Sequence, residues 1–180
     1  MLAVGIAGPL GAGKTSLARG LCEALPASLV SIGGVIKSEA IARGLPLRRR
    51  ILQDLGNELI ESEGASAFLE RLLAAHGTSS AGIWIFDSIR HEVVWRTIAR
   101  VHTRALLIYQ ECSESDSLIR VAARDGVPEA VVREFLSHPM ELEAQALRTI
   151  ADCVIRPSTP AEAIQVALDA IRTAALPDEG

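Results

Sequence analysis

The chain has 180 residues, of which 49% are hydrophobic and 22% charged, and its formal net charge is −4. This length can bury one core of ordinary size, so we expect a single domain over residues 1–180. The acidic balance disfavours bulk electrostatic binding of nucleic acid. Its apolar runs are shorter than the roughly 20 residues that span a membrane, and the first lacks the basic segment of a signal peptide. Three isolated cysteines favour free thiols in a reducing compartment. We therefore expect a cytoplasmic protein, whose oligomeric state stays open.

Short apolar runs alternate with amphipathic stretches along the chain. Strands are predicted over residues 2–7, 28–32, 83–86, 105–109 and 153–155. Helices are predicted over residues 16–25, 35–43, 49–61, 65–76, 93–101, 115–124, 129–136, 141–149 and 161–173. Because the strands are apolar throughout, they are typical of parallel strands covered on both faces. The pattern predicts an α/β fold with helices on both faces of a parallel sheet, and we expect residues 176–180 to fray.

The first predicted strand and helix enclose a glycine-rich segment that matches the pattern G-x-x-x-x-G-K-[ST] in full. In such a loop the backbone N–H groups point inward, and the dipole of the following helix adds positive potential. Lys14 is expected to reach the β- and γ-phosphates of a nucleoside triphosphate, and the Thr15 hydroxyl to ligate Mg²⁺. The residues predicted to bind MgATP here are Gly8, Pro9, Leu10, Gly11, Ala12, Gly13, Lys14, Thr15 and Ser16.

Asp87 and Arg90 follow the third predicted strand, at the edge of the sheet where ligands bind in such folds. The Asp87 carboxylate can hold Mg²⁺, directly or through water, and can orient an attacking oxygen. Arg90, which we place at the start of the next helix, can clamp an anionic substrate with two hydrogen bonds. The alternatives are a solvated strand-end carboxylate for Asp87 and a surface salt bridge for Arg90.

Other cations of interest lie on predicted helices. Arg120 and Arg124 are four residues apart, so they share one helix face. They are either solvated or close over a triphosphate and neutralise the charge that develops in phosphoryl transfer. Lys37 follows the second strand by five residues, and its alternative is an exposed helix lysine. The histidines lack the spacing of metal ligands.

Together these segments resemble the nucleoside monophosphate kinase group of P-loop kinases. Residues 30–37 are similar to the group's "STGD-hh-R" segment, with Lys37 in the arginine position and Gly34 where an aspartate is usual. Residues 87–90, Asp-Ser-Ile-Arg, resemble its "DGIR" form. Arg120 and Arg124 have the R-x-x-x-R spacing that opens the lid, which implies Arg120 over the adenine and Arg124 on the phosphates. Residues 151–159 resemble the "ADYVI-x-N-x-[ST]" segment, whose loop backs the adenine.

The resemblance also implies an acceptor site. Residues 52–59 are similar to the acceptor-side helix of deoxynucleotide-kinase-like members, in which Arg49, Gln53 and Asn57 face the acceptor. Lys37 and Arg90 complete the expected set of acceptor-binding residues. The implied fold is a three-layer P-loop domain with a five-stranded parallel sheet, a helical acceptor-binding insert at about residues 33–76 and a short lid at about residues 115–138. The implied activity is transfer of the γ-phosphate of MgATP to a nucleoside or deoxynucleoside monophosphate, with Lys14, Asp87, Arg90 and Arg124 as catalytic residues.

Other P-loop functions stay open to different degrees. A regulatory GTPase is excluded because the guanine-reading N-K-x-D motif is impossible: the single asparagine, Asn57, precedes Glu58. Mechanochemical ATPases usually carry paired acidic residues after the third strand, whereas Asp87 precedes Ser88. A kinase of dephospho-CoA, shikimate or gluconate and an ATP-binding module without catalysis remain alternatives, because the fold alone does not set the acceptor.

Overall fold

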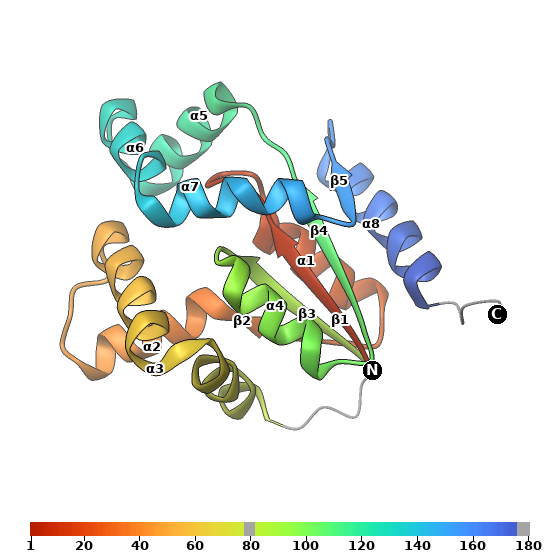
Figure 1. Ribbon diagram of the computed structural model, residues 1–180. Helices are drawn as coiled ribbons and strands as arrows, with labels where there is room; N and C mark the ends of the chain where they lie inside the picture. Colours follow the sequence, from red (N-terminus) through yellow and green to blue (C-terminus); the bar gives the residue numbers. More distant parts are fainter. Residues whose placement is uncertain (78–81, 176–180) are drawn as a thin grey trace.

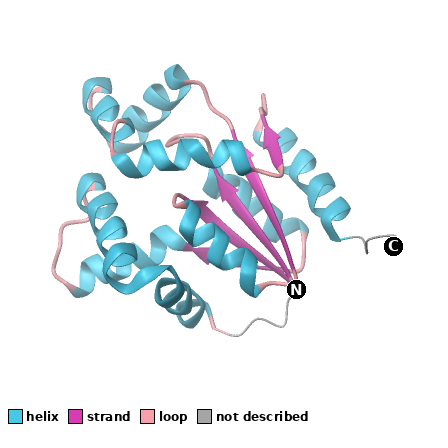
Figure 2. Cartoon of the chain, viewed as in Figure 1, coloured by secondary structure: helices cyan, strands magenta, loops and turns pink. Residues whose placement is uncertain are grey.

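A computed structural model describes residues 1–77 and 82–175 (Figures 1 and 2). Its centre is a five-stranded parallel sheet with the strand order β2-β3-β1-β4-β5. The strands are β1 (Leu2–Ala7), β2 (Ala27–Ser31), β3 (Ile83–Ile89), β4 (Arg104–Gln110) and β5 (Cys153–Ile155). The prediction of a parallel α/β sheet with five strands is therefore confirmed.

Strand β1 is enclosed on all sides, which explains its continuous apolar sequence. It pairs along its whole length with β3 on one edge and β4 on the other, and all of its residues are buried. Helices cover the two faces of the sheet (Figure 2). On one face the apolar cluster includes side chains of α1 (Lys14–Ala24) and α8 (Pro160–Ala175). On the other it includes side chains of α2 (Ile32–Ala42), α3 (Arg49–His76) and α4 (Glu92–Val101).

Two groups of helices stand beyond the carboxyl ends of the strands. In Figure 1, α5 (Glu114–Asp125) and α6 (Glu129–Leu136) lie at the upper left, and α2 and α3 lie at the lower left. Helix α7 (Pro139–Ala146) and the 3₁₀ turn η1 (Leu147–Ile150) lead back to β5. A small apolar cluster joins the α5–α6 pair to the loop after β1, and its buried members are Leu10, Leu118, Val121 and Val132.

Several predicted boundaries are corrected by the structure. Strand β3 continues through Asp87 to Ile89, and α4 begins at Glu92, so Arg90 precedes the helix instead of opening it. The reason is a bulge: Ile6 pairs with Asp87 and Ala7 with Ile89, so the intervening Ser88 is left out of register.

The starts of two helices also differ from the prediction. Helix α2 starts at Ile32 because the Ser31 hydroxyl accepts a hydrogen bond from the Gly34 N–H and caps it. Helix α7 starts at Pro139, whose fixed φ suits a first helical position. Gly64 interrupts α3 with a non-helical backbone, which agrees with the prediction of two helices on either side of it.

None of the described helices is long and apolar enough to cross a membrane. The expectation that residues 176–180 fray lies outside the described residues.

Leu107 provides a test of the core, since its side chain on β4 is fully buried. Leu107→Ala is expected to lower the free energy of unfolding by about 2–5 kcal/mol, because it removes apolar contacts and leaves a cavity. Leu142→Ala, at an exposed position of α7, is the matched control and is expected to change it by less than about 0.5 kcal/mol. Urea unfolding followed by circular dichroism measures both. Equal effects would contradict this assignment of the core.

Candidate active site

The glycine-rich loop joins β1 to α1 and requires glycine for steric reasons. Gly8 has φ 142°, and a Cβ atom there would lie 2.2 Å from the backbone oxygen of Gln110 on β4. Gly13 has φ 90° and precedes the first residue of α1. Both conformations are rarely adopted by residues with a side chain. The loop therefore passes close to β4 and ends at the amino terminus of α1, a position suited to binding anions.

Lys14 folds back over this loop. Its Nζ donates to the backbone oxygens of Gly8 at 2.8 Å and Pro9 at 2.7 Å, and the residue is 5% exposed. Burial lowers the pKa of Lys14 to about 7, and the positive charge of Arg90 adds to this effect. Bound phosphates would favour the charged amine and raise this pKa again.

Thr15 and Asp87 meet at the end of the loop. Thr15 Oγ1 donates to Asp87 Oδ2 at 2.8 Å, and Ser88 Oγ donates to Asp87 Oδ1 at 2.8 Å. Asp87 is 4% exposed, and the bulge at Ser88, with φ 71°, lies directly beside it. Carboxylate and hydroxyl oxygens are ligands that Mg²⁺ accepts, and this ion usually keeps several waters and substrate oxygens as well. The described residues contain no cluster of three or more His, Cys, Asp or Glu side chains that could hold a metal without such help.

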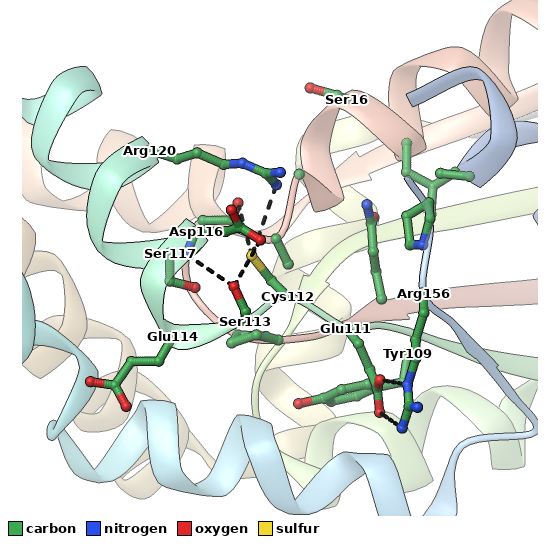
Figure 3. Close-up of a pocket in the computed structure, with 18 of the residues that line it drawn as sticks. Ser16, Tyr109, Glu111, Cys112, Ser113, Glu114, Asp116, Ser117, Arg120 and Arg156 are labelled. Atoms are coloured by element: carbon green, nitrogen blue, oxygen red, sulfur yellow. Dashed lines mark hydrogen bonds and ion pairs between the residues drawn. The ribbon is translucent and has the colours of Figure 1, made fainter. Parts of the chain in front are cut away.

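A cavity of about 1320 Å³ lies on one side of the loop, and we call it the β5-side cavity (Figure 3). Its walls come from the loop, from α5 and from the segments that follow β4 and β5. Arg120 Nη1 approaches Cys112 Sγ at 3.8 Å on one wall, and Arg156 pairs with Glu111 on another. Residues 156–159, the end of the segment 151–159 for which the family resemblance implies a loop backing an adenine, contribute to this lining together with Pro160.

A second cavity of about 1140 Å³ lies on the other side of the loop, and we call it the α3-side cavity. Lys14, Thr15 and residues of α2, α3 and the turn after β3 line it, together with residues of α5 and α7. Its basic lining residues are Lys14, Lys37, Arg48, Arg49, Arg50, Arg90, Arg120 and Arg124. Its apolar lining residues include Ile32, Ile36, Leu52, Ile60, Phe68, Val94, Phe135 and Met140. Gly11, Gly13, Ser16 and Arg120 line both cavities, so the loop forms the wall between them.

Carboxylates hold three arginines of the α3-side cavity. Arg90 pairs with Glu141 of α7, which is 1% exposed and also accepts a hydrogen bond from Gln53 Nε2 at 3.1 Å. Asp125 accepts from Arg49 Nη2 at 2.8 Å and from Arg124 Nε at 2.8 Å. Partial burial opposes ionisation of Asp125, but the hydrogen bonds from Arg124 and Arg49 prevail and lower the pKa of its carboxyl group.

The structure brings most of the predicted site residues together. The residues from distant segments that line the α3-side cavity are Lys37, Arg49, Gln53, Arg90, Arg120 and Arg124. Asn57 does not line this cavity: it lines a shallow hollow with Asp54, Glu58, Glu61 and Ser62. The helical period explains the difference, because positions 49, 52, 53, 56 and 60 form one stripe of α3 and position 57 falls beside it.

Sequence reasoning missed three polar residues of this cavity. Glu141 and Asp125 are the counter-ions described above, and Asp125 could have been suspected only because it adjoins Arg124. His91 is buried and lines the cavity, with Nδ1 2.7 Å from Glu143 Oε2. Nε2 of His91 and Oε1 of Gln53 have no hydrogen-bond partner within the described part of the chain. Buried polar atoms without a partner are unusual in folded proteins, and a ligand or an ordered water is one way to satisfy them.

The lowered pKa of Lys14 predicts proton uptake when nucleotide binds. At about pH 8 the amine is mostly neutral in the free protein, and triphosphate oxygens would restore its charge. We expect calorimetric binding enthalpies for a non-hydrolysable MgATP analogue to differ between buffers of different ionisation enthalpy, by nearly one proton per site. Lys14→Met is expected to abolish this dependence, whereas Lys37→Met should preserve it. A buffer-independent enthalpy for the unsubstituted protein would contradict the prediction.

Comparisons with known proteins agree with this geometry. A family profile described as an AAA domain matches residues 4–137, and no curated protein matches the chain. A shikimate kinase structure from Acinetobacter baumannii in complex with shikimate is 19% identical, with a TM-score of 0.58 over 97% of this chain and 95% of that one. TT1252 from Thermus thermophilus is 18% identical (TM-score 0.65, 98% of each chain). A gluconokinase from Sinorhizobium meliloti is 18% identical (TM-score 0.56, 96% and 93%). At these identities the structures establish the fold. The chain therefore belongs to the AAA domain family, and its fold is that of the small P-loop kinases.

Proposed function

We propose that this chain transfers the γ-phosphate of MgATP to a small phosphate-bearing acceptor, with a nucleoside or deoxynucleoside monophosphate as the class that fits best. One observation carries the proposal: the phosphate-binding loop is the wall shared by two large cavities. A donor in the β5-side cavity and an acceptor in the α3-side cavity would meet at Lys14 and Thr15. This is the arrangement that in-line transfer between two bound molecules needs.

In this proposal the β5-side cavity binds the adenosine part of ATP. The loop residues 8–16 hold the phosphates through backbone N–H groups and Lys14, and Arg120 and the segment 156–160 flank the base. Residues 115–138, which include all of α5 except Glu114 and the whole of α6, act as the lid. Its apolar contact with Leu10 supports a coupling between lid position and loop position.

Thr15 and Asp87 are the residues that would hold Mg²⁺. The ion would neutralise charge on the transferring phosphate and orient its oxygens. Asp87 also adjoins the opening of the α3-side cavity through Ser88, which lines it, so its carboxylate is suited to orienting the acceptor oxygen. Lys14 and Arg124 supply positive charge where negative charge develops, while the bond from phosphorus to the ADP oxygen breaks and that to the acceptor oxygen forms.

The lining of the α3-side cavity supports an acceptor that is both anionic and partly apolar. Arg49, Arg90 and Lys37 provide several cations, and a phosphate held in water needs more than one of them. Aliphatic and aromatic side chains such as Phe68, Leu52 and Met140 offer a surface for a flat ring. Gln53 and His91 add hydrogen-bonding atoms that lack protein partners in the described structure. We propose the segment 33–76 as the acceptor-binding insert.

A second candidate is a kinase of a sugar-acid acceptor. The fold likeness to a shikimate kinase and a gluconokinase favours it, since those structures align over most of this chain. A screen of nucleoside monophosphates, nucleosides, shikimate and gluconate with MgATP, read as ADP formed, separates the two. Turnover of a neutral nucleoside or a sugar acid, without turnover of any nucleotide, would overturn the preferred acceptor class. ATP consumption unaffected by any acceptor would favour an ATPase module.

Asp87→Asn tests the proposed role of the carboxylate. We expect kcat to fall at least ~10²-fold while the Kd for MgATP changes much less, because the charge acts mainly in the transition state. EDTA is expected to stop transfer in the unsubstituted enzyme. Asp169→Asn on α8, which lines neither cavity, is the control for loss of one negative charge. A near-normal kcat for Asp87→Asn would refute the role.

Arg90→Ala and Lys37→Ala test the acceptor side. Each is expected to raise the acceptor KM about 10-fold or more and to leave the ATP KM nearly unchanged, since each removes a cation from the α3-side cavity only. The control is Arg96→Ala, an exposed position on α4 that pairs with Glu92. Steady-state kinetics with each substrate varied in turn measures both constants. A rise confined to the ATP KM would contradict the assignment.

A further inference from the structure

Asp125 is the last residue of α5 and bridges two walls of the α3-side cavity. Its Oδ2 accepts from Arg49 of α3 and its Oδ1 from Arg124 of the same helix α5, each at 2.8 Å. The two arginines come from segments 75 residues apart in the sequence and converge on this one carboxylate. Asp125 therefore holds together two cations that line the cavity in which an anionic substrate is proposed to bind.

The two acidic residues of the cavity differ in how firmly they are fixed. Glu141 is almost fully buried, and Gln53 holds its second oxygen, so moving it would leave a charge inside the protein. The Asp125 side chain is 20% exposed and stands at a helix end, before Gly126 with φ 66°. Solvent is available to Asp125 if it leaves the arginines. Asp125 is thus a displaceable counter-ion, and Glu141 is a fixed one.

Displacement sets a requirement on the incoming anion. Because Asp125 is part of the chain, it competes at a high effective concentration for Arg49 and Arg124. A substrate carboxylate carries the same single charge as Asp125 and gains little by replacing it. A phosphate dianion carries twice that charge and more acceptor oxygens, so it forms stronger charge-assisted hydrogen bonds with the same pair.

Resting on the proposed function, we propose that Asp125 determines specificity by occupying Arg49 and Arg124 until a dianionic phosphate group displaces it, and that it thereby discriminates against monoanionic carboxylate acceptors. The side chain contributes no contact to the acceptor. It acts by competing with the substrate for the two arginines, so a substrate must carry more negative charge than Asp125 to displace it. Its removal is therefore expected to strengthen anion binding, the reverse of what loss of a purely structural ion pair would do.

The experiment measures anion binding without turnover. With the loop filled by a non-hydrolysable MgATP analogue, inorganic phosphate and acetate are titrated calorimetrically at a pH where phosphate is a dianion. The unsubstituted protein is expected to bind phosphate at least ~10-fold more tightly than acetate. Asp125→Asn is expected to bind phosphate about 10-fold more tightly than the unsubstituted protein and to gain measurable acetate binding. Asp125→Ser provides a second test if the asparagine variant folds poorly.

Controls separate the proposal from general charge effects. Asp169→Asn makes the same change in net charge at an exposed position of α8 and is expected to leave phosphate affinity unchanged. Glu141→Gln is expected to weaken phosphate binding, because it frees Arg90 from its fixed position. In an Arg49→Gln background the gain from Asp125→Asn should shrink, since one of the two released cations is missing.

Two results would overturn the proposal. One is phosphate affinity that stays the same or falls in both folded Asp125 variants, and the other is acetate binding to the unsubstituted protein as tightly as phosphate. Neither result depends on catalysis. A protein that phosphorylates none of the screened acceptors can still show the expected phosphate and acetate affinities. Conversely, a protein that phosphorylates a nucleotide can fail to show them, so the experiment tests this proposal independently of the proposed function.

Discussion

The pairing of β1 with both β3 and β4 is the constraint on which the rest of the site depends. The register sets Asp87 beside the end of β1, where the glycine-rich loop starts, and brings Gln110 so close that Gly8 tolerates no side chain. Thr15 at the start of α1 then reaches Asp87. Three chain segments far apart in sequence thus meet at the loop because one buried strand has neighbours on both edges.

Charge compensation is the second organising feature. Without counter-ions, the positive charges of the basic residues that line the α3-side cavity would repel one another. They would also lower the pKa of Lys14 further, beyond the effect that Arg90 already has. Glu141 and Asp125 relieve the repulsion in different ways, Glu141 as a buried partner and Asp125 as a partly exposed partner at a helix end. The protein can therefore hold a cationic cavity although its overall charge is negative. Under the proposal above, affinity for an anion depends on how easily Asp125 leaves Arg49 and Arg124.

Helices α5 and α6 contribute residues to both cavities. Arg120 lines both cavities, Arg124 lines the α3-side cavity, and the apolar cluster around Leu10 fixes the α5–α6 pair to the phosphate-binding loop. The Arg49–Asp125 ion pair adds a polar link from α5 to α3. A ligand that breaks this link would change the contacts between the two groups of helices while the apolar contact with the loop remains.

Local sequence determined the sheet, its buried strands and the phosphate-binding loop, because continuous apolar runs and required glycines act through the backbone of their own segment. It also indicated Asp87 and Arg90 as residues of one sheet edge, and it placed Arg120 and Arg124 on one helix face, either solvated or closing over a triphosphate. Tertiary structure alone decided that Arg90 pairs with Glu141, that Asp125 bridges Arg49 and Arg124, and that Asn57 falls outside the cavity. Ion pairs between distant helices depend on how those helices pack, and a one-residue step rotates a side chain by about 100° around a helix. The helical period places position 57 beside the stripe of positions 49, 52, 53, 56 and 60, but only the packing of α3 decides which stripe faces the cavity. No pattern within a single segment encodes how distant helices pack.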